Sequence, residues 1–203
     1  MERTRRISTT YLTELSLLVA IIILMAFTPI GYVKVFAVEI TLIVVPVAVG
    51  AITLGPKAGA ILGGVFGATS FIRCFGLNAF GTMLMSINPV GAFVTCFIAR
   101  ILVGWFTGLI YAALKRTKIK EGTSILVSSL CCPLLNTVLF MSSTILFFYN
   151  TEPIQNIAVT LGTTNPITFV IAFVGMNGLI EALACFLVGG AISQGLNKAL
   201  RRR

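Results

Sequence analysis

The sequence predicts an all-α integral membrane protein, a bundle of about six transmembrane helices with both termini in the cytoplasm. Of the 203 residues, 57% are hydrophobic and 10% are charged, which lies far outside the usual composition of soluble domains. Several apolar runs reach the roughly 20 residues that a helix needs to cross hydrocarbon. We therefore expect a single membrane domain over residues 1–203, without room for a soluble catalytic or nucleotide-binding domain.

The first span is expected at about residues 11–29, because a Thr-Pro-Ile-Gly sequence interrupts the apolar run there. Ser16 and Ala20 within it are small residues four positions apart, a spacing that lets another helix approach closely in lipid. Packing against other helices of the same bundle would explain these two residues equally well.

Two further spans, at about residues 40–54 and 58–72, follow a polar outer loop at 31–39 and are joined by a tight Gly-Pro-Lys turn. The third span carries four glycines, which give it a smooth surface for close packing: Gly59, Gly63, Gly64 and Gly67. A phosphate-binding loop is a more specific interpretation of these glycines. The Gly-Lys-Ser/Thr ending of that motif is missing, so this interpretation is set aside.

The remaining spans are expected at about residues 87–114, 124–149 and 166–196. Residues 73–86, before the fourth span, are rich in aromatic residues and methionine, which predicts an outer loop that dips into the membrane or closes over a site. Residues 150–165 are rich in Thr, Asn, Pro and Gly, and they are expected to form a third outer loop.

The basic residues predict the orientation. Most of them flank the spans on one side, against Lys34 and Arg73 on the other: Arg3, Arg5, Arg6, Lys57, Lys115, Arg116, Lys118, Lys120, Lys198, Arg201, Arg202 and Arg203. The side rich in Lys and Arg faces the cytoplasm. The net charge of +9 therefore reads as a topology signal and not as a surface for nucleic acid.

Arg100 lies near the middle of the fourth span, where a charge costs about 2.5 to 3.5 kcal/mol on insertion scales. Two partners compete for it: a bound anionic solute, or Glu181 on the sixth span. Arg100, Asn136 and Glu181 all lie roughly 18 to 23 Å from the cytoplasmic ends of their spans, and Asn177 lies one turn further out. We expect a polar chamber that opens outward, with these four residues and Asn88 as ligand-binding residues. The alternative is a permanent Arg100–Glu181 ion pair, with the asparagines bonding between helices.

Enzymatic activity, metals and cofactors are not expected. The chain has no histidine, and its five cysteines have neither Cys-x-x-Cys spacing nor a plausible set of metal ligands. An intramembrane enzyme would place a nucleophile beside a base, and no such pair is evident.

Four stretches resemble the S components of energy-coupling factor (ECF) vitamin transporters: residues 40–70, 99–111, 136–140 (Asn-Thr-Val-Leu-Phe) and 177–182 (Asn-Gly-Leu-Ile-Glu-Ala). The resemblance implies a six-helix subunit that captures its substrate and docks onto a membrane scaffold (T) subunit with two cytoplasmic ATPases. Together these subunits form an ABC importer in a prokaryotic cell membrane. The docking helix of this family typically shows Ala-x-x-x-Ala, and its nearest match here is Ser16 and Ala20.

The resemblance is closest to the pantothenate-type branch, notably at residues 27–32 and at the helix-four arginine. It implies capture of a small water-soluble vitamin, first of all pantothenate, for uptake driven by ATP. Two departures bear on the ligand: Ala99 stands where a proline is frequent, and Val-Val-Pro at 44–46 stands where a polar residue is common. An S component for riboflavin or another vitamin remains open. So does a stand-alone secondary transporter, although that class would usually show paired repeats or broken helices, and neither is evident.

Overall fold

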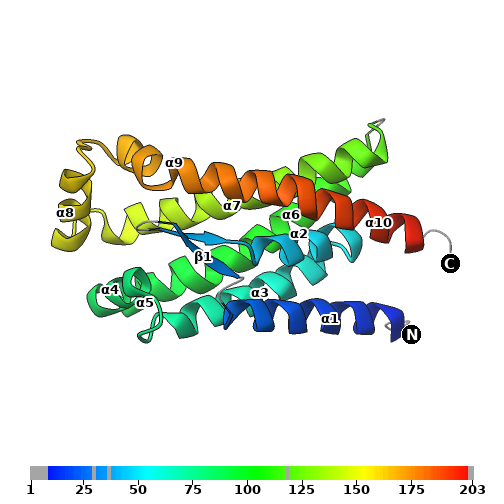
Figure 1. Cartoon of the computed structure of the whole chain (residues 1–203), viewed down its shortest axis with the longest axis horizontal. Helices are drawn as coiled ribbons and strands as arrows, with labels where there is room; N and C mark the ends of the chain where they lie inside the picture. Colours follow the sequence, from blue (N-terminus) through cyan, green and yellow to red (C-terminus); the bar gives the residue numbers. More distant parts are fainter. Residues whose placement is uncertain (1–8, 29–30, 36–37, 118, 201–203) are drawn as a thin grey trace, which may run out of the picture.

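Helices aligned along one axis make up most of the fold (Figure 1). The computed structural model describes residues 9–28, 31–35, 38–117 and 119–200, and the side chains among these outside 33–40, 176–180, 197 and 199–200. The α-helices are α1 (Thr9–Ala26), α2 (Val44–Thr53), α3 (Pro56–Arg73), α4 (Ala79–Ile87), α5 (Pro89–Phe93), α6 (Ala99–Lys115), α7 (Glu121–Phe148), α8 (Glu152–Thr160), α9 (Pro166–Ala184) and α10 (Gly190–Leu200).

Two of the long helices contain a π-helical turn. η1 (Val94–Ile98) joins α5 to α6, and η2 (Cys185–Gly189) joins α9 to α10. Such turns add a residue to the helical repeat and are frequent at functional sites. The turn η1 ends two residues before Arg100, and it contains Thr95, whose carbonyl oxygen accepts a hydrogen bond from the Arg100 side chain.

Within the described part of the chain, three helical stretches are long and apolar enough to cross a membrane: Thr9–Ala26, Pro89–Lys115 and Glu121–Phe148. Shorter apolar helical stretches cover Val44–Thr53, Pro166–Gly175 and Glu181–Leu196. The predicted class, a helical membrane bundle, is confirmed in this form, whereas the number of spans and their orientation stay predictions. The beginning of α1 and the end of α10 lie at one end of the bundle, and α4, α5 and α8 lie at the opposite end (Figure 1).

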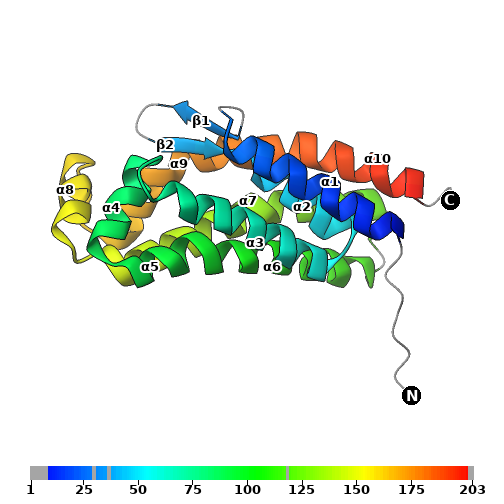
Figure 2. The same ribbon diagram turned by 90° about the horizontal axis from the view of Figure 1, so that it is seen from below.

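A short antiparallel hairpin begins within the predicted first outer loop (31–39) and ends at Thr41, two residues beyond it. β1 (Tyr32–Val35) pairs with β2 (Val38–Thr41), and Tyr32 stands opposite Thr41 at the base of the hairpin. Strand β2 contacts α9, and Figure 2 shows the hairpin lying along the side of the bundle next to that helix. The base of the hairpin therefore brings the backbone of Thr41 close to the site described below.

The glycines of α3 serve the close packing that the sequence predicts. A Cβ atom at Gly59 would collide with the carbonyl group of Gly104, and one at Gly63 would collide with the carbonyl group of Arg100. Farther along α3, a Cβ at Gly67 would lie 2.8 Å from the carbonyl oxygen of Phe97. Helices α3 and α6 thus pack backbone against backbone, which holds the Arg100 backbone directly against α3.

Candidate functional site

The guanidinium group of Arg100 is the centre of the site. Arg100 is only 7% exposed, and its Nη1 donates a hydrogen bond to the carbonyl oxygen of Thr95, five residues earlier in η1. Its Cζ lies 4.6 Å from the ring centre of Phe140 on α7 and 5.4 Å from that of Phe66 on α3. Contacts of this kind between a guanidinium and an aromatic face are attractive. The group is therefore held by a carbonyl and two rings from three different helices.

Glu181 does not form an ion pair with Arg100 among the described side chains. Its Oε1 accepts a hydrogen bond from the backbone N–H of Thr41 at 2.6 Å, at the base of the hairpin. The Glu181 carboxyl group also lies near the side chains of Asn136 and Arg100. The alternative of a permanent Arg100–Glu181 ion pair is not realised in this structure, and the buried guanidinium has no direct carboxylate partner within the part of the chain that the structure describes.

Several buried polar atoms around Arg100 have no hydrogen-bond partner among the described residues. They are Nε of Arg100, Oγ1 of Thr95 and Oδ1 of Asn136. Thr95 is fully buried and Asn136 is 7% exposed. A buried polar group without a partner costs about 1 to 3 kcal/mol, so such groups usually have a protein, water or ligand partner. These three atoms are donors and acceptors that a bound molecule is able to satisfy.

The structure brings three of the five predicted ligand-binding residues together: Arg100, Asn136 and Glu181. Asn177 lies on α9, one turn before Glu181, and its side chain is outside the described part of the chain. Asn88 joins α4 to α5, and its Oδ1 accepts the backbone N–H of Gly91 at 3.0 Å. Asn88 thus has a capping role, and its predicted ligand contact stays a prediction.

Four site residues were missed in the sequence: Phe66, Thr95, Phe140 and Thr41. Phe140 lies one helical turn after Asn136 and shares its face, so helical periodicity could have indicated it. Thr95 contributes through the π-helical turn and Thr41 through its backbone N–H. Neither contribution has a signal in the residue type, because both depend on the path of the backbone.

The two predicted docking residues lie away from this site. Ser16 and Ala20 on α1 are both exposed, and their neighbours Leu17 and Leu24 are 61% and 62% exposed. The bundle packs against the opposite side of α1, through residues such as Ile22 and Ala26, which are fully buried. Packing within the bundle therefore does not explain the small residues at positions 16 and 20.

The site combines one fixed cation, amide and hydroxyl groups, and aromatic walls inside a helical membrane bundle. These groups are chemically able to bind a small polar molecule that carries an anionic group. A family model for the substrate-specific component of ECF transporters matches residues 10–192, so the chain belongs to this family of membrane transport proteins. The resemblance inferred from the sequence is thereby confirmed.

Two similar proteins are named as pantothenate transporters. The chain is 30% identical to the pantothenic acid transporter PanT of Lactococcus lactis subsp. cremoris over 174 residues, which cover 81% of either chain. It is 35% identical to the pantothenate transporter PanT of Leuconostoc mesenteroides subsp. mesenteroides over 115 residues, 54% of either chain.

Proposed function

We propose that this protein is the substrate-binding subunit of an ECF importer and captures pantothenate from outside the cell, with Arg100 holding the carboxylate. The observation that carries this proposal is the buried guanidinium of Arg100, which has no carboxylate partner among the described side chains. A buried cation needs a counter-charge or equivalent dipoles, and a carboxylate ligand supplies one. The names of the two relatives support the choice of pantothenate.

The geometry of Arg100 suits a carboxylate. Nη1 donates to Thr95, and Nε has no partner among the described residues, so the Nε side of the guanidinium is able to present two parallel N–H groups to the two oxygens of one carboxylate. Pantothenate also has an amide and two hydroxyl groups. Oδ1 of Asn136 accepts from one of these donors, and Oγ1 of Thr95 serves as a second polar contact.

Energy for transport comes, in this proposal, from a separate T subunit with two ATPases. The exposed Ser16 and Ala20 on α1 support docking through that helix, because small side chains let another helix approach closely. The bundle is proposed to cross the membrane about six times with both termini in the cytoplasm.

The experiment that tests the ligand is purification of the protein in detergent, followed by mass spectrometry of the small molecules it retains and by titration calorimetry with pantothenate. We expect one pantothenate per chain. Retention of a flavin, with no heat of binding for pantothenate, would instead favour an S component for riboflavin. Uptake of solute by the protein alone in liposomes would favour a stand-alone secondary transporter.

A further inference from the structure

Cys74 and Cys96 bring their sulfur atoms into contact. The two Sγ atoms lie 3.5 Å apart, although the residues are 22 positions apart in the chain. Cys74 is the residue that ends α3, and Cys96 lies in the π-helical turn η1. Helix α3 ends, and η1 begins, towards the end of the bundle that α4 and α5 occupy (Figure 2). Both residues are free thiols in this structure.

Close packing of α3 against η1 holds the two sulfur atoms in place. A Cβ at Gly67 would lie 2.8 Å from the carbonyl oxygen of Phe97 and 3.2 Å from that of Cys96, so the two backbones touch. Phe71 of α3 and Phe93, directly before η1, add an edge-to-face contact with ring centres 5.3 Å apart. Both cysteines are buried, with exposed fractions of 2% and 4%. The sulfur contact is therefore part of a packed interface between two elements.

Buried cysteines often serve only as small apolar side chains. Two observations distinguish this pair from that role. The polar contacts of the Cys74 Sγ are the other sulfur and the carbonyl oxygen of Ser70 at 3.4 Å. Arg100 lies near both sulfur atoms, and Arg73 lies near that of Cys74. A neighbouring cation stabilises the thiolate, which is the form that reacts with an oxidant.

We propose that Cys74 and Cys96 are an oxidation site, at which a peroxide converts the two thiols to a disulfide that joins η1 to α3. For this bond the Sγ atoms have to approach from 3.5 Å to about 2.05 Å. Cys74 ends its helix and is followed by a turn in which Gly76 has φ +113°, so a small shift there leaves the interior of α3 in place. Thr95, whose carbonyl oxygen accepts the hydrogen bond from Arg100, directly precedes Cys96. The disulfide therefore also holds the segment that orients Arg100.

The reaction needs only the two thiols and the peroxide. One sulfur attacks a peroxide oxygen, the O–O bond breaks, and the leaving hydroxide takes up the thiol proton as water, which produces a sulfenic acid. The second sulfur attacks the sulfenic sulfur, so that the S–S bond forms, the S–O bond breaks and a second water leaves. The two thiols lose two electrons and two protons in total, and the peroxide is reduced to two waters. Disulfides persist outside the cytoplasm. Only the outward exposure of this end of the bundle rests on the function proposed above, whereas the thiol pair does not.

Two-step alkylation of the purified full chain tests the site. The protein is reduced, treated with hydrogen peroxide, unfolded in N-ethylmaleimide, reduced again and treated with iodoacetamide, and its peptides are identified by mass spectrometry. We expect the iodoacetamide label on Cys74 and Cys96, and N-ethylmaleimide on Cys185, which is equally buried at the start of the other π-helical turn. Before the second reduction, the intact mass should fall by two hydrogen atoms, whereas a sulfenic acid would add one oxygen atom. N-ethylmaleimide on both Cys74 and Cys96 after oxidation would overturn the proposal.

Matched variants show whether the two cysteines act as a pair. In Cys74→Ala, Cys96 should no longer form a disulfide, whereas Cys185→Ala should oxidise as the parent protein does. Oxidation should raise the melting temperature of the parent protein and of Cys185→Ala by about 5 °C or more, because the cross-link restricts the unfolded chain, and dithiothreitol should reverse the rise. Cys74→Ala should show no rise. If Cys74→Ala does not fold, Cys96→Ala provides the same comparison. Equal disulfide formation at Cys96 with and without Cys74 would refute the pair.

Pantothenate binding by the reduced and the oxidised protein separates this site from the proposed function. Because the bond forms where α3 and η1 already touch, oxidation should leave Kd within about threefold of the reduced value. A loss of affinity of about tenfold or more would show that bond formation displaces η1, against the proposal that the disulfide holds this segment in place. If the reduced protein binds no pantothenate, the proposed ligand fails, and the alkylation pattern and the melting temperatures still decide the oxidation site.

Discussion

The contacts around Arg100 fix the orientation of its guanidinium group. Its backbone is pressed against Gly63 of α3, its Nη1 donates to Thr95, and its guanidinium faces the rings of Phe66 and Phe140. These contacts hold the charge in one orientation before a ligand arrives, and such preorganisation reduces the entropy lost on binding. In the proposed function, this fixed orientation lets the residue recognise the planar geometry of a carboxylate and not merely its charge.

We expect Arg100→Lys to weaken pantothenate binding, because lysine lacks the parallel donors. Arg100→Ala should weaken it by about 2 to 5 kcal/mol, the range for removing one partner of a buried charge pair. Titration calorimetry measures both effects. Lys115→Ala is the matched control, since it removes a cation from the other end of the same helix and should leave the affinity unchanged. Equal binding of the alcohol analogue of pantothenate and of the acid would contradict the role of Arg100.

Glu181 is expected to have a different role from Arg100, because its Oε1 holds the hairpin through Thr41. Glu181→Gln keeps an oxygen acceptor at this position and should remain folded, whereas Glu181→Ala leaves the Thr41 N–H without its partner and should lose about 1 to 3 kcal/mol of stability. Thermal unfolding in detergent compares the two variants. If Glu181→Gln is as unstable as Glu181→Ala, the charge of Glu181 stabilises the fold more than its hydrogen bond to Thr41 does.

At the scale of the secondary-structure elements, the contact between α3 and α6 depends on glycine at specific positions. Gly63 faces the Arg100 carbonyl too closely for any side chain, whereas a Cβ at the adjacent Gly64 would lie at 3.7 Å from Ile101, an ordinary contact distance. The two positions share a sequence environment and differ only in the surface that they face. Alanine substitutions at these two glycines therefore form a matched pair of variants.

Gly63→Ala should force α3 and α6 apart and destabilise the bundle by about 1 to 3 kcal/mol, as overpacking does. Gly64→Ala should be neutral or slightly stabilising, because alanine is the better helix former. Thermal unfolding of the two variants, together with pantothenate binding by Gly63→Ala, checks this expectation. Comparable melting temperatures for both variants would show that α3 and α6 do not pack as closely as the structure describes.

The exposed side of helix α1 is the proposed docking surface for the T subunit. Ser16→Trp and Ala20→Trp should block uptake by the assembled transporter and leave ligand binding nearly intact, because a large side chain prevents close approach of a partner helix. Leu17→Trp, at a neighbouring position of α1 that is also exposed, is the control. The measurement is uptake in cells that hold the ATPase module, alongside binding by the purified variants. Undiminished uptake in the Ser16 and Ala20 variants would locate docking elsewhere.

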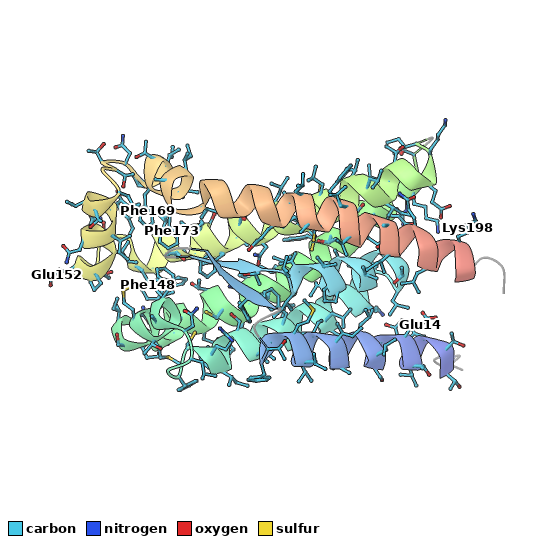
Figure 3. All side chains as sticks on the ribbon, viewed as in Figure 1. Glu14, Phe148, Glu152, Phe169, Phe173 and Lys198 are labelled. Carbon is cyan, nitrogen blue, oxygen red and sulfur yellow. The ribbon has the colours of Figure 1, made fainter. Side chains whose placement is uncertain are left out.

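At the scale of the whole molecule, the two ends of the bundle are predicted to face opposite sides of the membrane. Figure 3 shows Glu152 on α8 at one end, and Glu14 on α1 and Lys198 on α10 at the other. In a cysteine-free background, an impermeant thiol reagent added to intact cells should label a cysteine introduced by Glu152→Cys. The Lys198→Cys variant should react only after the cells are permeabilised. The reverse pattern would invert the proposed topology.

Composition and local pattern by themselves determined that this chain is a helical membrane protein with a buried arginine. The reason is physical: the cost of exposing polar groups to hydrocarbon depends on residue type and run length, and both are local properties. The same reasoning located the smooth glycine surface of α3, and the motif resemblance located the family. It also selected Asn136 and Glu181, which the structure places near Arg100.

The tertiary structure alone decided what those residues touch. Three features of the site depend on backbone geometry or join segments far apart in the chain. They are the hydrogen bond from Arg100 to Thr95 in the π-helical turn, the hydrogen bond from the Thr41 backbone to Glu181, and the rings of Phe66 and Phe140 beside Arg100. No residue type or spacing specifies them. Contacts of this kind follow from how the apolar faces of several helices pack together, and each pairwise contact is too weak to be fixed without all the others.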